Sequence, residues 1–224
     1  MLGIGSNLPE FEVVGVKPGF NSHEENGESA FENINNKSFE GKWKVIYFYP
    51  KDFTFVWPSE LIAFDKRISE FEKRNVQVLG CSVDSHFSHL RWKEMPVEKG
   101  GIGKVKYPLI ADIDKSIARS YDVLLGVTPA SVMTADDELE TSVGGGVALR
   151  GSFLIDEHGN VRHEIKNDLP LGRNVDEMLR LLDALDHHNK HGEVCPAGWM
   201  KGKTGMNPSD QGMRDYLANN TEEL

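Results

Sequence analysis

The sequence has little cysteine: its 224 residues include two thiols, Cys81 and Cys195. Small secreted domains that cannot build a large core usually depend on several disulfides, so this count argues against a disulfide-rich secreted protein. The cysteine content therefore predicts a protein of the reducing cytoplasm.

Long apolar runs and an excess of positive charge are also missing. No stretch approaches the roughly 20 apolar residues that span a bilayer, and the opening residues show no basic region followed by an apolar block, so we expect no signal peptide. Lys and Arg number 25 against 35 Asp and Glu, which gives a formal charge of −10. Nucleic acid and anionic membranes would repel such a chain, so neither is an expected partner.

Enough apolar residues are present for one compact core, since 39% of the chain is hydrophobic and 27% is charged. Periodicity predicts strands over 43–49, 76–83 and 107–112, and a hairpin of 151–155 with 161–166. It predicts helices from 58, over 85–95, from 114 to 121 and over 174–185. This alternation predicts an α/β fold with a mixed central sheet flanked by helices, most simply a thioredoxin-like arrangement.

Three segments stand outside this pattern. The first 40 residues are loop-rich, residues 126–146 are predicted to be an inserted surface loop, and residues 187–224 are predicted to be a polar tail with weak periodicity. We therefore expect a domain over 1–186, with a loop-rich N-terminal extension, followed by a tail over 187–224.

The segment Tyr49-Pro-Lys-Asp-Phe-Thr-Phe-Val-Trp-Pro-Ser-Glu60 joins the first long strand to the first long helix. The positive end of a helix dipole and unpaired backbone N–H groups point into such a loop, which makes it suited to anions. A cysteine there would ionise more easily than an ordinary thiol. This sequence has Trp57 at that point.

In these motifs the chain resembles the typical two-cysteine peroxiredoxins, the group that includes alkyl hydroperoxide reductase C. Pro50, Thr54 and position 57 fall in the register of the family motif Pro-x-x-x-Thr/Ser-x-x-Cys. Three later segments match in order: Leu149-Arg-Gly-Ser-Phe-Leu-Ile-Asp156, Asn167-Asp-Leu-Pro-Leu-Gly-Arg-Asn-Val-Asp-Glu177 and Lys190-His-Gly-Glu-Val-Cys-Pro-Ala-Gly-Trp199. The resemblance extends over most of the chain from about 43 to 200.

The resemblance implies a thiol peroxidase that reduces hydrogen peroxide and organic hydroperoxides without a cofactor or metal. A thiolate at position 57 would attack the peroxide, with Thr54 and Arg150 binding its oxygens and the thiolate, Pro50 shielding the pocket and Glu60 orienting the arginine. The sulfenic acid would form a disulfide with Cys195 of a second subunit, and a thioredoxin-type or flavoprotein disulfide reductase would restore both thiols. Such proteins form dimers that assemble into rings, commonly decamers.

Trp57 departs from this pattern at the nucleophile. Indole has one N–H donor, no acceptor and no anionic form near neutral pH, so the chain is predicted to lack peroxidase activity. Overpacking by the larger side chain would cost on the order of 1–3 kcal/mol and could displace the first helical turn. The intact neighbouring motifs favour a deliberate Cys→Trp substitution, with a natural pseudoenzyme as the alternative.

Simpler interpretations exist for the other residues. Thr54 could be a loop hydroxyl, Glu60 a carboxylate that the helix dipole favours, and Arg150 a surface ion-pair partner. Only their alignment with the family motifs assigns them catalytic roles. Cys195 is either an incidental tail thiol or the resolving cysteine, which the tail motif favours.

The other cysteine and the histidines, which could bind metal by residue type, are expected to have structural roles or to lie on the surface. Cys81 is expected to be an inert core thiol. His86 with His89, and His187, His188 and His191, are expected on solvated surfaces rather than as metal ligands. A second function, an oligomeric holdase chaperone, stays open. A general disulfide reductase is disfavoured because the chain has no Cys-x-x-Cys pair.

Overall fold

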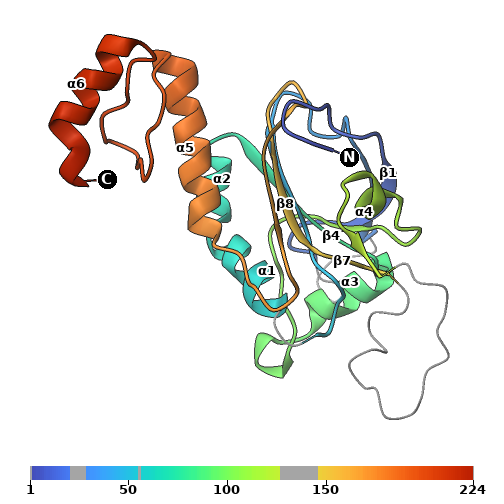
Figure 1. Cartoon of the computed structure of the whole chain (residues 1–224). Coiled ribbons are helices and arrows are strands. Elements are labelled where there is room, and N and C mark those ends of the chain that lie inside the picture. Colours follow the sequence, from blue (N-terminus) through green and yellow to red (C-terminus); the bar gives the residue numbers. More distant parts are fainter. Residues whose placement is uncertain (1, 21–28, 55–56, 127–145, 224) are drawn as a thin grey trace. The chain divides into compact units, whose positions relative to one another are not determined.

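The computed structural model of the chain describes residues 2–20, 29–54, 57–126 and 146–223 (Figure 1). The chain divides into two compact units, Met1–Arg173 and Asn174–Leu224. The sequence places the boundary after 186, whereas this division falls after Arg173, so the helix predicted over 174–185 belongs to the C-terminal unit. Nearly all of the predicted 126–146 insertion lies outside the described residues.

A seven-stranded mixed sheet forms the centre of the N-terminal unit (Figure 1). In spatial order its strands are β2 (Phe31–Asn35), β1 (Glu12–Val16), β5 (Leu109–Ala111), β4 (Val76–Ser82), β3 (Trp43–Phe48), β8 (Arg150–Ile155) and β9 (Val161–Asn167). Strands β3, β4 and β5 run parallel, while β1 pairs antiparallel with β5 and β8 with β3. The α/β architecture predicted from the sequence is confirmed.

Strand β3 lies in the core: five of its six side chains are buried, and four of these, Val45 to Phe48, are apolar. Successive strand residues point to opposite faces of a sheet. The Tyr47 ring stacks on Phe64 with centroids 4.3 Å apart, while Phe48 contacts Tyr121 at 5.0 Å. Helices α1 (Trp57–Lys66) and α4 (Ser116–Ser120) therefore cover opposite faces of the sheet.

The other helices of this unit follow their local signals. Ser85 caps α3 (His86–Glu94), and its hydroxyl accepts from the Ser88 N–H at 3.2 Å. The helix predicted from 58 buries Leu61, Phe64, Ile68 and Phe71, but it is interrupted at Arg67, where α2 (Ile68–Glu72) begins. The short helix η1 (Val97–Lys99) and a small sheet of β6 (Leu124–Leu125) and β7 (Val147–Ala148) complete the described elements of this unit.

The prediction of a loop-rich N-terminus is wrong for residues 12–16 and 31–35, which form β1 and β2. These strands pair with each other over five residue positions, from Glu12↔Asn35 to Val16↔Phe31. Their stabilisation comes from pairing across a long connection and from β5, which local sequence patterns do not reveal.

The C-terminal unit contains α5 (Val175–His191), α6 (Asp210–Asn220) and η3 (Thr221–Glu223). Helix α5 continues six residues past the predicted end and stops at Gly192, whose φ of 69° suits a glycine C-cap. The polar tail with weak periodicity that is predicted over 187–224 contains a helix over 210–220, which is capped by Ser209. Among the described helices, none is long and apolar enough to cross a lipid bilayer.

Candidate active site

The loop after β3 is a tightly folded turn. Pro50 is buried directly behind the strand, where its missing N–H ends the ladder. Phe53 has a φ of 59° and a 51% exposed side chain, a costly left-handed backbone for a bulky residue. The Thr54 hydroxyl donates to the Lys51 carbonyl at 3.0 Å. The loop thus holds Thr54 against the carbonyl of Lys51, the residue after Pro50, ahead of α1.

Helix α1 begins at position 57, and Glu60 lies in its first turn. Residues three apart on a helix are neighbours on its surface, so position 57 and Glu60 share one side of this turn. Phe55, Val56 and the side chain of Trp57 lie outside the described residues. The displaced first turn expected from overpacking therefore stays a prediction.

Arg150, the first residue of β8, is completely buried and reaches Glu60. Its Nη1 donates to Glu60 Oε2, and its Nε donates to the Leu169 carbonyl at 2.6 Å. The sequence alone leaves open a surface ion pair for this arginine, but its partner is a carboxylate that is itself only 4% exposed. The arginine is therefore held in a fixed orientation inside the fold.

A second arginine, Arg173, completes the cluster, although the sequence patterns give it no catalytic role. Its backbone N–H and its Nε donate to Glu60 Oε1 at 2.7 and 3.0 Å, and its Nη2 donates to Oε2 at 3.1 Å. Its Nη1 donates to the carbonyls of Phe48 and Gly151, both at 2.7 Å. Arg173 thus ties together α1, β3 and β8, and its guanidinium lies 5.1 Å from the Tyr47 ring centroid.

The electrostatics of this cluster follow from one carboxylate between two cations. Burial by itself raises the pKa of Glu60, but the charge and hydrogen bonds of Arg173, with the charge of Arg150, bring it below the usual value. Burial lowers the pKa of Arg150, while Glu60 opposes that effect. A buried site with one excess positive charge results, which suits the binding of an anion.

Comparison with known proteins identifies the family to which this fold and these residues belong. The AhpC/TSA family profile matches residues 4–164, and a profile of the C-terminal domain of 1-Cys peroxiredoxin matches residues 184–219. The chain belongs to the AhpC/TSA family of peroxiredoxins. The fold it shares with them is thioredoxin-like, and antioxidant peroxidase is the family's role.

Individual relatives support this placement over most of the chain. Alkyl hydroperoxide reductase C of Helicobacter pylori is 52% identical over 80% of this chain and 82% of its own length. Peroxiredoxin-1 of Gallus gallus is 42% identical over 96% of this chain and 95% of its own length. The reduced 2-Cys peroxiredoxin of Plasmodium vivax superposes with a TM-score of 0.80 at 45% identity, covering 96% of this chain and 98% of that structure.

The two thiols of this peroxiredoxin chain differ in accessibility. Cys81 in β4 is fully buried, as the sequence predicts, and burial raises the pKa of its thiol well above the usual value. Cys195 is half-buried, and its Sγ donates to the Ala184 carbonyl at 3.4 Å. Partial burial raises the pKa of Cys195, opposed by the charge of Arg180. Cys195 is thus a thiol in a folded segment of the C-terminal unit.

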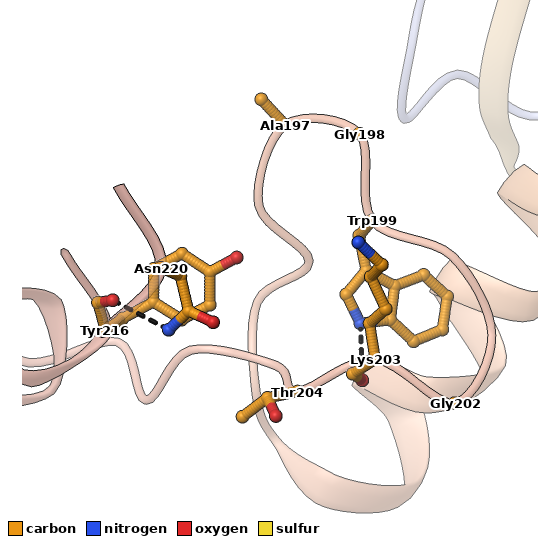
Figure 2. A pocket seen from close by; sticks show the side chains of 8 residues that line it. All are labelled: Ala197, Gly198, Trp199, Gly202, Lys203, Thr204, Tyr216 and Asn220. Atoms are coloured by element: carbon orange, nitrogen blue, oxygen red, sulfur yellow. Dashed lines mark hydrogen bonds between the residues drawn. The ribbon is translucent and has the colours of Figure 1, made fainter. Parts of the chain in front are cut away.

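A hollow of about 220 Å³ lies just beyond Cys195 in the same unit (Figure 2). It separates the loop around Trp199 from the end of α6, and its lining residues are Ala197, Gly198, Trp199, Gly202, Lys203, Thr204, Tyr216 and Asn220. The Trp199 indole donates to the Lys203 carbonyl at 3.0 Å, and the Asn220 amide donates to the Tyr216 carbonyl at 2.8 Å. These two hydrogen bonds stabilise the loop on one side of the hollow and the end of α6 on the other.

The expectation of solvated histidines is wrong for His89. Its side chain is completely buried against Asp52, whereas His86 lies on a partly exposed turn of the same helix. In the C-terminal unit, His187 Nε2 lies 2.8 Å from Glu193 Oε2. In the part of the chain that the structure describes, no group of three His, Cys, Asp or Glu side chains is arranged to hold a metal ion.

Proposed function

We propose that this chain carries the site of a two-cysteine hydroperoxide reductase in which Trp57 replaces the nucleophile and abolishes peroxidase activity. The observation that carries this proposal is the buried Glu60–Arg150–Arg173 cluster, which begins in the helical turn that contains position 57. Such a cluster has the charge to hold a thiolate and a peroxide oxygen beside it.

With a cysteine at 57, the chemistry follows from these residues. The thiolate attacks one peroxide oxygen, an S–O bond forms, the O–O bond breaks, and the electron pair leaves on the other oxygen, which is protonated. Arg150 stabilises the developing charge, Thr54 hydrogen-bonds the peroxide and Pro50 limits water. The sulfenic acid then condenses with Cys195 of a second subunit and releases water as the disulfide forms.

We further propose the partners that this cycle requires. A thioredoxin-type or flavoprotein disulfide reductase supplies the two electrons that return the disulfide to thiols. The subunits form a homodimer that assembles into a ring, most simply a decamer, in the cytoplasm. Support comes from family membership and from the low cysteine content.

The deciding experiment compares the chain with Trp57→Cys. In a coupled assay with hydrogen peroxide, a disulfide reductase and thioredoxin, Trp57→Cys is expected to consume peroxide while the unaltered chain does not. Trp57→Ser is the matched control, since its hydroxyl ionises far less readily than a thiol. Robust turnover by the unaltered chain contradicts the proposal, as does an inactive but folded Trp57→Cys protein.

The second candidate function is a holdase chaperone that does not depend on residue 57. Its test is suppression of heat-induced aggregation of a client protein by the unaltered chain and by Trp57→Cys. Equal protection by both, with no peroxide consumption by either, favours this function over the peroxidase.

The origin of Trp57 has a separate test. A tryptophan codon at this position in the genomic DNA indicates a natural pseudoenzyme, and a cysteine codon indicates a substitution.

A further inference from the structure

The turn that carries Cys195 lies on helix α5 and is held there by two hydrogen bonds. The Cys195 Sγ donates to the Ala184 carbonyl at 3.4 Å, and beyond the cysteine the Trp199 carbonyl accepts from Arg180 Nη1 at 2.9 Å. Ala184 and Arg180 are four residues apart on the helix, so they are neighbours on one face of it. The guanidinium of Arg180 and the sulfur of Cys195 therefore meet the same side of α5.

Arg180 is fixed by a further contact along its own helix. Its Nε and Nη2 donate to the two carboxylate oxygens of Glu177 at 2.7 and 2.8 Å. Such a two-point contact sets the plane of the guanidinium and leaves Nη1 for the turn. The Glu177 side chain is 45% exposed against 23% for Arg180, so water screens the carboxylate more than the guanidinium. A positive charge is thus held in place next to the turn.

Charges from the helix and from the turn itself act on the Cys195 thiol. Partial burial raises the pKa of Cys195, the charge of Arg180 lowers it, and the charge of Glu193 raises it. Two histidines of α5 hold Glu193 on the helix, since His187 Nε2 lies 2.8 Å from its Oε2 and His188 Nδ1 lies 2.7 Å from its carbonyl oxygen. Arg180 therefore supplies the charge that favours the thiolate.

We propose that Arg180 is a positioning residue for disulfide formation, which holds the Cys195 turn on α5 and places a positive charge beside its sulfur. This role rests on the proposed peroxidase function. In that step the Cys195 thiol loses its proton and its sulfur bonds to the sulfur of the sulfenic acid. The S–O bond breaks, its electron pair leaves on the oxygen, and the hydroxide takes up the proton as water. Because the thiolate is the attacking species, a cation that favours it speeds the step.

The first arm of the test uses the chain as it stands, in which Cys81 is buried and Cys195 is the accessible thiol. The rate of alkylation by iodoacetamide is measured by mass spectrometry between pH 6.5 and 10. Arg180→Gln removes the charge and can still donate to the Trp199 carbonyl. It is expected to lower the rate at pH 7 roughly three- to tenfold and to move the profile to higher pH.

Two further variants separate charge from packing. Arg180→Lys keeps a cation and should restore most of the rate at pH 7. The matched control is Lys201→Gln, because Lys201 also joins the turn to α5, through Asp183 at 3.1 Å, but is 68% exposed. Its profile should match that of the parent. A purely structural role for Arg180 would change the rate by one factor at every pH, and this result overturns the proposal.

The second arm follows disulfide formation in the Trp57→Cys background after one equivalent of hydrogen peroxide, by quenching and non-reducing electrophoresis. Arg180→Gln is expected to slow the appearance of the disulfide by a factor similar to that of the first arm. The rate constant for peroxide consumption should stay the same, because Arg180 acts on the second thiol and not on the first. Lys201→Gln should change neither rate.

The outcomes separate the two proposals. If Trp57→Cys is folded but inert toward peroxide, the proposed function fails, and the role of Arg180 fails with it. If Trp57→Cys forms its disulfide equally fast with and without Arg180→Gln, the positioning role alone is overturned. If Arg180→Gln does not fold, Glu177→Gln takes its place. This variant removes the opposing charge, so it should move the alkylation profile to lower pH, and an unmoved profile contradicts the proposal.

Discussion

At the scale of single residues, the most consequential feature is that Glu60 is shared by two arginines inside the protein. Each carboxylate oxygen accepts from a guanidinium, and Arg173 also satisfies two strand carbonyls. Breaking such a set leaves several buried polar groups unpaired at once, which costs far more than losing an exposed ion pair.

Arg173→Leu is therefore expected to destabilise the protein by about 3–5 kcal/mol, measured by urea denaturation followed by circular dichroism. The matched control is Arg162→Leu, which removes the pair to Asp156 at 3.3 Å from a side chain that is 30% exposed. That change should cost about 1 kcal/mol or less. Equal losses in the two variants would contradict the assignment of Arg173.

Because Lys93 of α3 is buried, we expect the free energy of unfolding to depend on pH. It is 1% exposed, with its ammonium 2.5 Å from the Lys17 carbonyl, and burial lowers its pKa to about 7, against the opposing charges of Asp65 and Glu32. Between about pH 7 and the usual lysine pKa of about 10.4, the unfolded chain binds more protons than the native one at this site, so this contribution to stability rises with pH. Below about pH 7 both states are protonated and the burial penalty is complete.

Lys93→Met should remove this penalty. The variant is expected to be more stable than the parent near pH 7, by a few kcal/mol, and the difference should shrink as the pH approaches 10. Urea denaturation of both proteins at pH 6.5, 8 and 9.5 measures it. A stability difference that does not change with pH would show that Lys93 is not the titrating group.

At the scale of elements, the connection between α3 and β5 is packed too closely for any added side chain at Gly101. A Cβ there would lie 2.0 Å from the Met95 carbonyl oxygen, which belongs to backbone that cannot give way cheaply. The same loop is tied to α3 by the Trp92 indole, which donates to the Gly100 carbonyl at 2.9 Å.

Gly101→Ala should accordingly destabilise the protein by more than about 2 kcal/mol, as overpacked sites do. Gly3→Ala is the control, because a Cβ there meets no heavy atom of the described residues within 4 Å and its backbone is ordinary. Thermal melts of both variants measure the effect. A Gly101→Ala protein that melts with the parent would contradict this packing.

The sequence predicts those elements whose signals are local. Helix α3 has its cap at Ser85, and the turn of the β8–β9 hairpin is closed by Gly159, which has a φ of 87°. Strands β1 and β2 lack such signals because pairing partners across the sheet stabilise them. Helix α6 has only a short and largely exposed apolar face, Met213, Tyr216 and Leu217, and contains Gly212, so the sequence signals for it are weak.

In the candidate site, too, contacts between residues far apart in the sequence could not be predicted. Family register locates Arg150 and Glu60, but Arg173 reaches Glu60 from 113 residues away, and His89 meets Asp52 across 37. No helical or strand period marks such contacts, because they arise where elements converge in three dimensions.

At the scale of the whole molecule, the two units differ in how much apolar surface they bury. The strands at the centre of the N-terminal unit are almost entirely buried, whereas α6, all of which the structure describes, contributes no buried residue. Helices of this length gain most of their stability from packing an apolar face, so α6 should open far more readily than the sheet.

Hydrogen exchange followed by mass spectrometry tests this difference. Peptides from α6 should exchange orders of magnitude faster than peptides from β3 and β4, whose amides exchange by global unfolding. Peptides from α5 are expected between these limits, since Val175, Met178 and Leu182 are buried. Protection of α6 equal to that of β4 would show that a partner surface covers this helix.

The unequal burial of the two cysteines has a practical consequence. Cys81 is fully buried in β4, whereas Cys195 is half-buried, and the sequence contains no other thiol. A maleimide dye should therefore attach to the native protein at one defined place without any prior mutagenesis. Its emission would make the segment around residue 195 visible to fluorescence spectroscopy, in ensembles or in single particles.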